Sequence, residues 1–167
     1  RTEATGYGVV FTIREALKLL DLRPENTRAS VQGFGNVAQY AIRLYRQIGG
    51  TVVCVSSWDQ GDQTSYSFRK STGIDPDELM AITDRFGGID KARAKSLGYE
   101  VLAGDAWIEQ AVDILMPCAL ENQVNGETAT RINARDKFMA EGANGPTPPE
   151  ADAILQKKGV YVIPDFL

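Results

Sequence analysis

The spacing of apolar residues separates helices from strands along the first third of the chain. Residues 6–20 and 36–48 carry apolar side chains at helical spacing, so that each segment has one apolar face. Residues 28–33 are typical of a short strand that ends at the glycines, and residues 51–56 form an apolar run that is rich in β-branched residues. Runs of this kind are typical of strands in a parallel sheet that is covered on both faces. We therefore expect helix, strand, helix and strand in that order.

The remaining pattern continues this alternation. Residues 59–73 are polar and rich in Ser, Gln and Gly, which predicts an exposed hairpin or loop. Further helices are expected at 75–86, 90–97, 127–132 and 149–158, and further strands at 99–103, 112–117, 137–141 and 160–165. Alternating strands and helices predict an α/β fold with an open, doubly wound, mostly parallel sheet and helices on both faces. Because 167 residues suit one domain, we expect residues 1–167 to form a single domain.

Composition narrows the classes of function. The net charge of −4 argues against nucleic acid as a partner, since nucleic-acid binding usually needs a basic face. No apolar run is long enough to cross a bilayer and no signal-peptide pattern is present, so we expect a cytoplasmic protein without membrane contact. Cys54 and Cys118 stand in apolar runs and are expected to be buried thiols in a reducing compartment. The absence of histidine removes the commonest general base and metal ligand, and we expect no metal site.

The stretch "VQGFGNVAQY" carries the most informative motif, in which Gly33, Gly35 and Ala38 follow the pattern G-x-G-x-x-A. A strand precedes this motif, a helix follows it and a second apolar strand comes next, as a dinucleotide site requires. In such a site the first glycine allows the tight turn and the second lets a pyrophosphate approach the backbone. The small third residue brings the helix close to the strand. The N-terminus of the helix would then bind the phosphates through its free N–H groups.

The position expected to hold the adenosine ribose departs from the usual pattern, in which an acid stands at the end of the second strand. The second strand ends at Ser56 and Ser57, whereas the first acid, Asp59, comes two residues later. Either Asp59 reaches back to the ribose or a serine replaces the acid, and a role for Asp59 in a turn is equally compatible. Trp58 would flank the adenine or pack under the following loop. The choice between NAD and NADP therefore stays open.

Four stretches together resemble the nucleotide-binding domain of the glutamate dehydrogenase family, which includes the leucine, phenylalanine and valine dehydrogenases. These stretches are "RTEATGYGV", "GFGNVA", "PCALENQVNGETA" and "AEGANGPTPPEAD", and the resemblance covers essentially the whole chain. It implies a Rossmann-type domain from an enzyme that oxidatively deaminates an amino acid, most similar to glutamate dehydrogenase. It also implies that the parent enzyme is a homo-oligomer, a hexamer in this family.

The resemblance assigns site residues one by one. It implies that NAD or NADP is contacted by Thr5, Gly33, Phe34, Gly35, Asn36, Val37, Ser57, Cys118, Ala119, Asn122 and Asn144. Arg1 and Asn144 would lie near the substrate. Ser57 stands where many family members carry the ribose-binding acid, which leaves the cofactor preference undecided. The family's catalytic lysine and aspartate belong to a separate substrate domain, so no catalytic residue is expected in this chain.

Two other readings remain compatible with the glycine motif. The chain lacks an initiator methionine and stops directly after an apolar run, which suggests a piece of a longer protein that binds a nucleotide without chemistry of its own. An unrelated doubly wound enzyme, such as a methyltransferase, would use the same glycine turn. Such an enzyme would bind S-adenosylmethionine in place of a dinucleotide.

Overall fold

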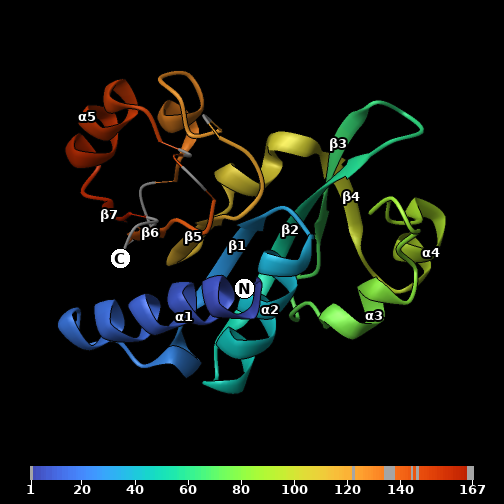
Figure 1. Ribbon diagram of the computed structural model, residues 1–167, viewed down its shortest axis with the longest axis horizontal. Helices are drawn as coiled ribbons and strands as arrows, with labels where there is room; N and C mark the ends of the chain where they lie inside the picture. Colours follow the sequence, from blue (N-terminus) through green and yellow to red (C-terminus); the bar gives the residue numbers. More distant parts are fainter. Residues whose placement is uncertain (1, 122, 134–137, 144, 146, 165–167) are drawn as a thin grey trace.

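The computed structural model describes residues 2–121, 123–133, 138–143, 145 and 147–164, and its strands form one sheet (Figure 1). The order across this sheet is β4-β3-β2-β1-β5-β6-β7. The strands are β1 (Arg28–Gln32), β2 (Thr51–Asp59), β3 (Thr64–Arg69), β4 (Glu100–Ala103), β5 (Ile114–Pro117), β6 (Phe138–Ala140) and β7 (Tyr161–Ile163).

The helices connect these strands in the expected alternation. The α-helices are α1 (Thr2–Leu19), α2 (Asn36–Gln47), α3 (Pro76–Met80), α4 (Lys91–Ser96) and α5 (Pro149–Lys157). Three short 3-10 helices complete the elements: η1 (Pro24–Asn26), η2 (Gly104–Glu109) and η3 (Thr128–Arg131).

The centre of the sheet is parallel and one edge is not. β1 pairs in parallel with β2 on one side and with β5 on the other, and β6 and β7 continue in the same direction. β3 runs antiparallel to both β2 and β4. The predicted open, mostly parallel sheet with helices on both faces is confirmed. The chain leaves β1 toward β2 but later returns to β5 on the opposite side of β1, which makes the β1–β5 boundary the topological switch point.

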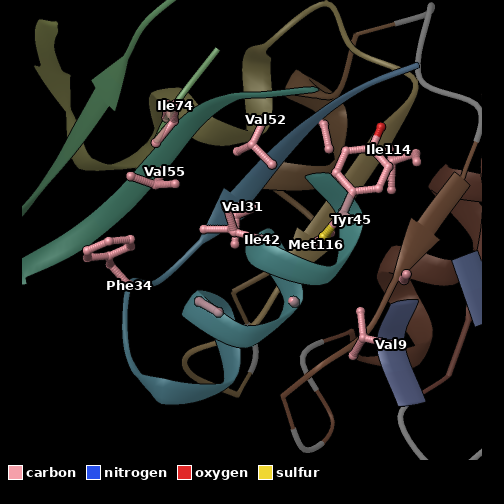
Figure 2. Close-up of a cluster of buried hydrophobic side chains, with 14 of the residues drawn as sticks. Val9, Val31, Phe34, Ile42, Tyr45, Val52, Val55, Ile74, Ile114 and Met116 are labelled. Carbon is pink, nitrogen blue, oxygen red and sulfur yellow. The ribbon is translucent and has the colours of Figure 1, made fainter. Parts of the chain in front are cut away.

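Each face of the sheet buries its own apolar core. On one face α1 and α2 cover residues of β1 and β2 such as Val31 and Val55, and Figure 2 shows Ile42 of α2 and Val9 of α1 in this cluster. The other face packs against η2, η3 and α5 around Cys54, Leu115 and Met139. Burial on both faces explains why the central strands read as continuous apolar runs in the sequence.

Two helices are shorter than predicted. The helix expected over 75–86 ends at Met80, because the chain then turns back and forms an isolated bridge between Thr83 and Ile89. The Asp84 carboxylate accepts hydrogen bonds from the backbone N–H groups of Phe86 and Gly88, at 2.7 and 3.0 Å, and so replaces the helical pattern with a turn. The helix expected over 127–132 is the 3-10 helix η3. The 3-10 helix η2 has no counterpart among the elements predicted from the sequence.

The polar segment 59–73 forms the expected hairpin, but part of it is not exposed. β3 lies between β2 and β4, so that Ser67 and Phe68 are buried. A strand with neighbours on both sides must bury some of its side chains even where its sequence is polar. Figure 1 shows that the tip of the β2–β3 hairpin extends away from the rest of the sheet.

Candidate functional site

The turn after β1 is shaped by a backbone that only glycine adopts easily. Gly33 has a φ of +96°, and a Cβ placed on it would lie 2.7 Å from the Cβ of Ala119. Its N–H donates to the Oγ of Ser56 at 3.1 Å. The turn is therefore held against the loop after β5 on one side and against β2 on the other.

Gly35 lies at the open N-terminus of α2. It is the N-cap residue, with φ −75° and ψ −174°, and no side chain caps the helix. Apart from Gly35 itself and its two chain neighbours, no atom of the described residues lies within 4 Å of the position that a Cβ on Gly35 would occupy. The N–H of Gln39 bonds to the carbonyl of Gly35 at 2.9 Å, which leaves the N–H groups of Asn36 and Val37 without an acceptor inside the helix.

This helix end has the electrostatic character of an anion site. The first turn of α2, all of which is described, carries no acidic residue, so nothing there opposes the positive end of the helix dipole. Free N–H groups next to open space can bind phosphate oxygens without help from a lysine. The residues present thus fit the pyrophosphate of a dinucleotide.

Phe34 presents its backbone to the turn and buries its side chain in the core. Its side chain is 5% exposed and lies in the core beside Val31 and Val55 (Figure 2). The Nε2 of Gln39 donates to the Phe34 carbonyl at 2.8 Å, which fixes the peptide between the two glycines. The aromatic ring anchors the loop, so that the N–H groups of α2 keep their direction.

The loop after β5 forms the other wall of the switch point. The N–H of Cys118 donates to the Gln32 carbonyl at 3.0 Å, and the N–H of Ala119 donates to the Oε1 of Gln32 at 3.2 Å. Cys118 is only partly buried, in contrast to the expectation and to the buried Cys54. Desolvation raises the pKa of the Cys118 thiol to about 12, so this side chain is a neutral thiol near pH 7. Asn122, Asn144 and Arg1, three of the expected site residues, lie outside the described residues.

Thr5 lies within α1 and is exposed. The next residue, Gly6, marks the place where α1 crosses α2, because a Cβ there would lie 2.7 Å from the Cβ of Tyr40 and 3.5 Å from the carbonyl of Val37. Thr5 is thus one residue from the contact that α1 makes with the first turns of α2. Thr5 does not cap this helix, since α1 already begins at Thr2.

Ser56 and Ser57 point to different surroundings. The buried Ser56 accepts from Gly33, whereas the Oγ of Ser57 donates to the carbonyl of Gly87 at 2.8 Å. Asp59 is engaged elsewhere, because its carboxylate accepts the N–H of Asp62 at 2.9 Å and pairs with the Nζ of Lys91 at 2.8 Å. Hydrogen bonding from Lys91 holds the pKa of Asp59 below its usual range. Of the two readings of Asp59, the turn residue agrees better with these contacts.

A crevice of about 430 Å³ adjoins the glycine turn on the face that carries η2. Gln32 and Ser56, which both bond to the turn or its facing loop, line this crevice together with the exposed Trp58 and the buried Trp107. Gln32 was not predicted as a site residue, and Ser56 was predicted only as a strand-end serine near the ribose. The available signal was a buried polar residue at the end of each of two apolar strands, directly beside the glycine motif.

The basic side chains at the end of β3, Arg69 and the following Lys70, do not contribute a free positive charge to this crevice. Arg69 forms a bidentate pair with Glu100, with both NH2–oxygen distances at 2.9 Å. Lys70 pairs with Glu78 at 3.1 Å and lies 4.7 Å from the centre of the Tyr99 ring. Both residues therefore stabilise the antiparallel edge of the sheet.

In the part of the chain that the structure describes, no helix is long and apolar enough to span a membrane. Within the same residues no group of three or more Cys, Asp or Glu side chains is arranged to hold a metal ion.

Comparison with known proteins places this site in context. A model of the glutamate/leucine/phenylalanine/valine dehydrogenase family matches residues 1–167. The chain belongs to this family. The NAD-specific glutamate dehydrogenase of Peptoniphilus asaccharolyticus is 36% identical over 167 residues, which make up 100% of this chain and 38% of that protein. The glutamate dehydrogenase of Thermotoga maritima is 39% identical over 168 residues, again 100% of this chain and 38% of the relative.

Solved structures of family members agree with the fold. The crystal structure of glutamate dehydrogenase from Peptoniphilus asaccharolyticus superposes with a TM-score of 0.74 at 34% identity, covering 99% of this chain and 35% of that chain. Another glutamate dehydrogenase structure superposes with a TM-score of 0.83 at 31% identity, covering 99% and 39% respectively. The chain thus spans 38% of the length of the sequence relatives above and corresponds to the NAD(P)-binding portion of this family.

Proposed function

We propose that residues 1–167 form the dinucleotide-binding domain of a dehydrogenase that oxidatively deaminates L-glutamate to 2-oxoglutarate and ammonia. The observation that carries the proposal is the open, uncapped N-terminus of α2 at Gly35, located at the switch point of a parallel sheet. The names of the sequence relatives support glutamate as the substrate.

The cofactor is NAD or NADP, which accepts the hydride from the α-carbon of the amino acid when it is bound. The N–H groups of Gly35, Asn36 and Val37 bind the pyrophosphate, and Gly33 and Phe34 hold the turn in place. The crevice beside Trp58 receives the adenosine end. Cys118 and Ala119 line the path toward the nicotinamide. There the neutral thiol and the methyl group exclude water.

The chain supplies binding and orientation, and the proton chemistry comes from a separate substrate domain. The chain has no histidine, and Lys70 and Lys91 are paired with carboxylates. The isolated chain therefore binds a dinucleotide weakly and turns over no amino acid. The parent enzyme is a cytoplasmic homo-hexamer that binds neither nucleic acid nor membrane.

Saturation-transfer NMR with NAD, NADP and S-adenosylmethionine tests the binding half of this proposal. We expect saturation of the adenine protons of both dinucleotides and none for S-adenosylmethionine. Selective binding of S-adenosylmethionine would favour a methyltransferase instead. Glutamate-dependent reduction of NAD or NADP by the purified chain would contradict the assignment of the proton chemistry to another domain.

A further inference from the structure

Trp58 occupies an unusual place on the wall of the crevice. Its side chain is 47% exposed, yet it stands in β2 two residues after the buried Ser56 and lines the crevice with Gln32. Its indole Nε1–H donates to the Oε1 of Gln60 at 3.2 Å. A large exposed ring needs its backbone held firmly if it is to present a flat face to a ligand.

The residue before Trp58 is held by the loop that follows α3. The Oγ of Ser57 donates to the carbonyl of Gly87 at 2.8 Å. Gly87 has a φ of +90° and belongs to the turn that the Asp84 carboxylate closes through the N–H groups of Phe86 and Gly88. This contact fixes one side of Trp58.

The residue after Trp58 is held by the first residue of α4. The Nζ of Lys91 lies 2.8 Å from the Oδ2 of Asp59 and 2.9 Å from the Oδ2 of Asp62, and it also stacks 4.5 Å from the centre of the Tyr66 ring. The hydroxyl of Tyr66 donates to the Oδ2 of Asp62 at 2.7 Å. One ammonium group therefore joins both strands of the hairpin to α4.

Both contacts come from one short segment, residues 84–91. The bridge between Thr83 and Ile89 and the hydrogen bond from the N–H of Asp90 to the carbonyl of Ile82, at 2.9 Å, close this segment on itself. The segment thus contacts the residues of β2 directly before and directly after Trp58.

We propose that residues 84–91 act as a clip that positions Trp58 against the adenine of the dinucleotide, with Lys91 as its main positioning residue. The inference rests on the proposed function, because it requires a dinucleotide in the crevice. Lys91 touches no ligand itself. It acts by keeping Asp59, and with it the Trp58 backbone, in place.

The test compares four forms of the chain: the parent protein, Lys91→Met, Lys91→Arg and Lys95→Met. Lys95 is exposed four residues further along α4 and serves as the matched control. Calorimetry measures affinity for ADP and for nicotinamide mononucleotide. The heteronuclear NOE of the Trp58 indole Nε1–H reports the rigidity of the ring in the free protein, which a general loss of stability would not change selectively.

We expect Lys91→Met to weaken ADP binding by about three- to tenfold, in keeping with the loss of a partly exposed ion pair network. In the same variant nicotinamide mononucleotide binding stays unchanged and the Trp58 NOE falls. Lys91→Arg restores both the ADP affinity and the Trp58 NOE. Lys95→Met resembles the parent in all three measurements. Unchanged ADP affinity and an unchanged NOE in Lys91→Met would overturn the clip while leaving the proposed function intact. If the parent protein fails to bind ADP and NAD, the proposed function fails and the positioning role falls with it.

Discussion

The centre of the sheet and its antiparallel edge are held together by different kinds of contact. At the centre, steric fit decides the geometry, because Gly33 packs its Cα directly against Ala119. At the edge, charged side chains decide it, as in the pairs of Arg69 with Glu100 and of Lys91 with Asp59. The centre therefore holds the candidate anion site in a sterically constrained turn, and the edge adds a wall whose position depends on polar contacts between segments distant in sequence.

The largest effect should come from filling the space at the centre. Gly33→Ala forces a side chain into a φ of +96° and against the Cβ of Ala119, so we expect a loss of about 2–5 kcal/mol in the free energy of unfolding. Urea denaturation measures it. Gly35→Ala is the matched control, and its unfolding free energy should stay within about 1 kcal/mol of the parent, the cost of a poorer N-cap residue. Equal losses in both variants would show that the turn is not sterically constrained.

Gly35→Val should separate binding from folding. The added side chain enters the open space above the N-terminus of α2 and blocks the approach of a pyrophosphate. We expect dinucleotide affinity to fall by at least about a hundredfold, or roughly 2.7 kcal/mol, while the urea midpoint is kept. Calorimetry with NAD checks the affinity. Parental affinity in this variant would mean that the glycine motif is only a turn.

The ribose end should give a smaller effect on cofactor preference. We expect the affinities of the parent protein for NAD and NADP to agree within about tenfold, since Ser57 neither repels nor neutralises a phosphate. Ser57→Asp should shift preference toward NAD by about tenfold relative to Ser57→Asn, because only the carboxylate repels the extra phosphate of NADP. A parent preference above about a hundredfold, or no difference between the two variants, would place the ribose pocket elsewhere.

The smallest effect should be the response of the antiparallel edge to a lower pH. Hydrogen bonds from Lys91 hold the pKa values of Asp59 and Asp62 below their usual range. A lowered folded-state pKa gives stability that is present above the unfolded value of about 3.9 and is lost as the pH falls through the folded value. We therefore expect the contacts of Lys91 with Asp59 and Asp62 to persist between pH 7 and pH 5. Carbon-detected NMR titration of the two carboxyl groups would reveal a contrary transition in that range.

The sequence predicted the centre of the molecule better than its edge. The motif of Gly33, Gly35 and Ala38 predicts the backbone geometry of the turn, because only glycine suits it. The apolar residues of the neighbouring strands are also local signals in the sequence. The bond from Ser57 to Gly87 joins residues 30 positions apart and leaves no local pattern. The helix expected over 75–86 failed for a different reason, because a local contact competes with the helical pattern: the Asp84 side chain accepts hydrogen bonds from the backbone N–H groups of Phe86 and Gly88.

The most direct test of the central claim is amide mapping of a ¹⁵N-labelled chain during titration with NAD. A site at the switch point predicts saturable shifts of the Gly35, Asn36 and Val37 amides. The amides of Tyr161, Val162 and Ile163 in β7, at the far edge of the sheet, should stay unchanged. Shifts concentrated away from the glycine turn, or no saturable shift with either NAD or NADP, would contradict the account.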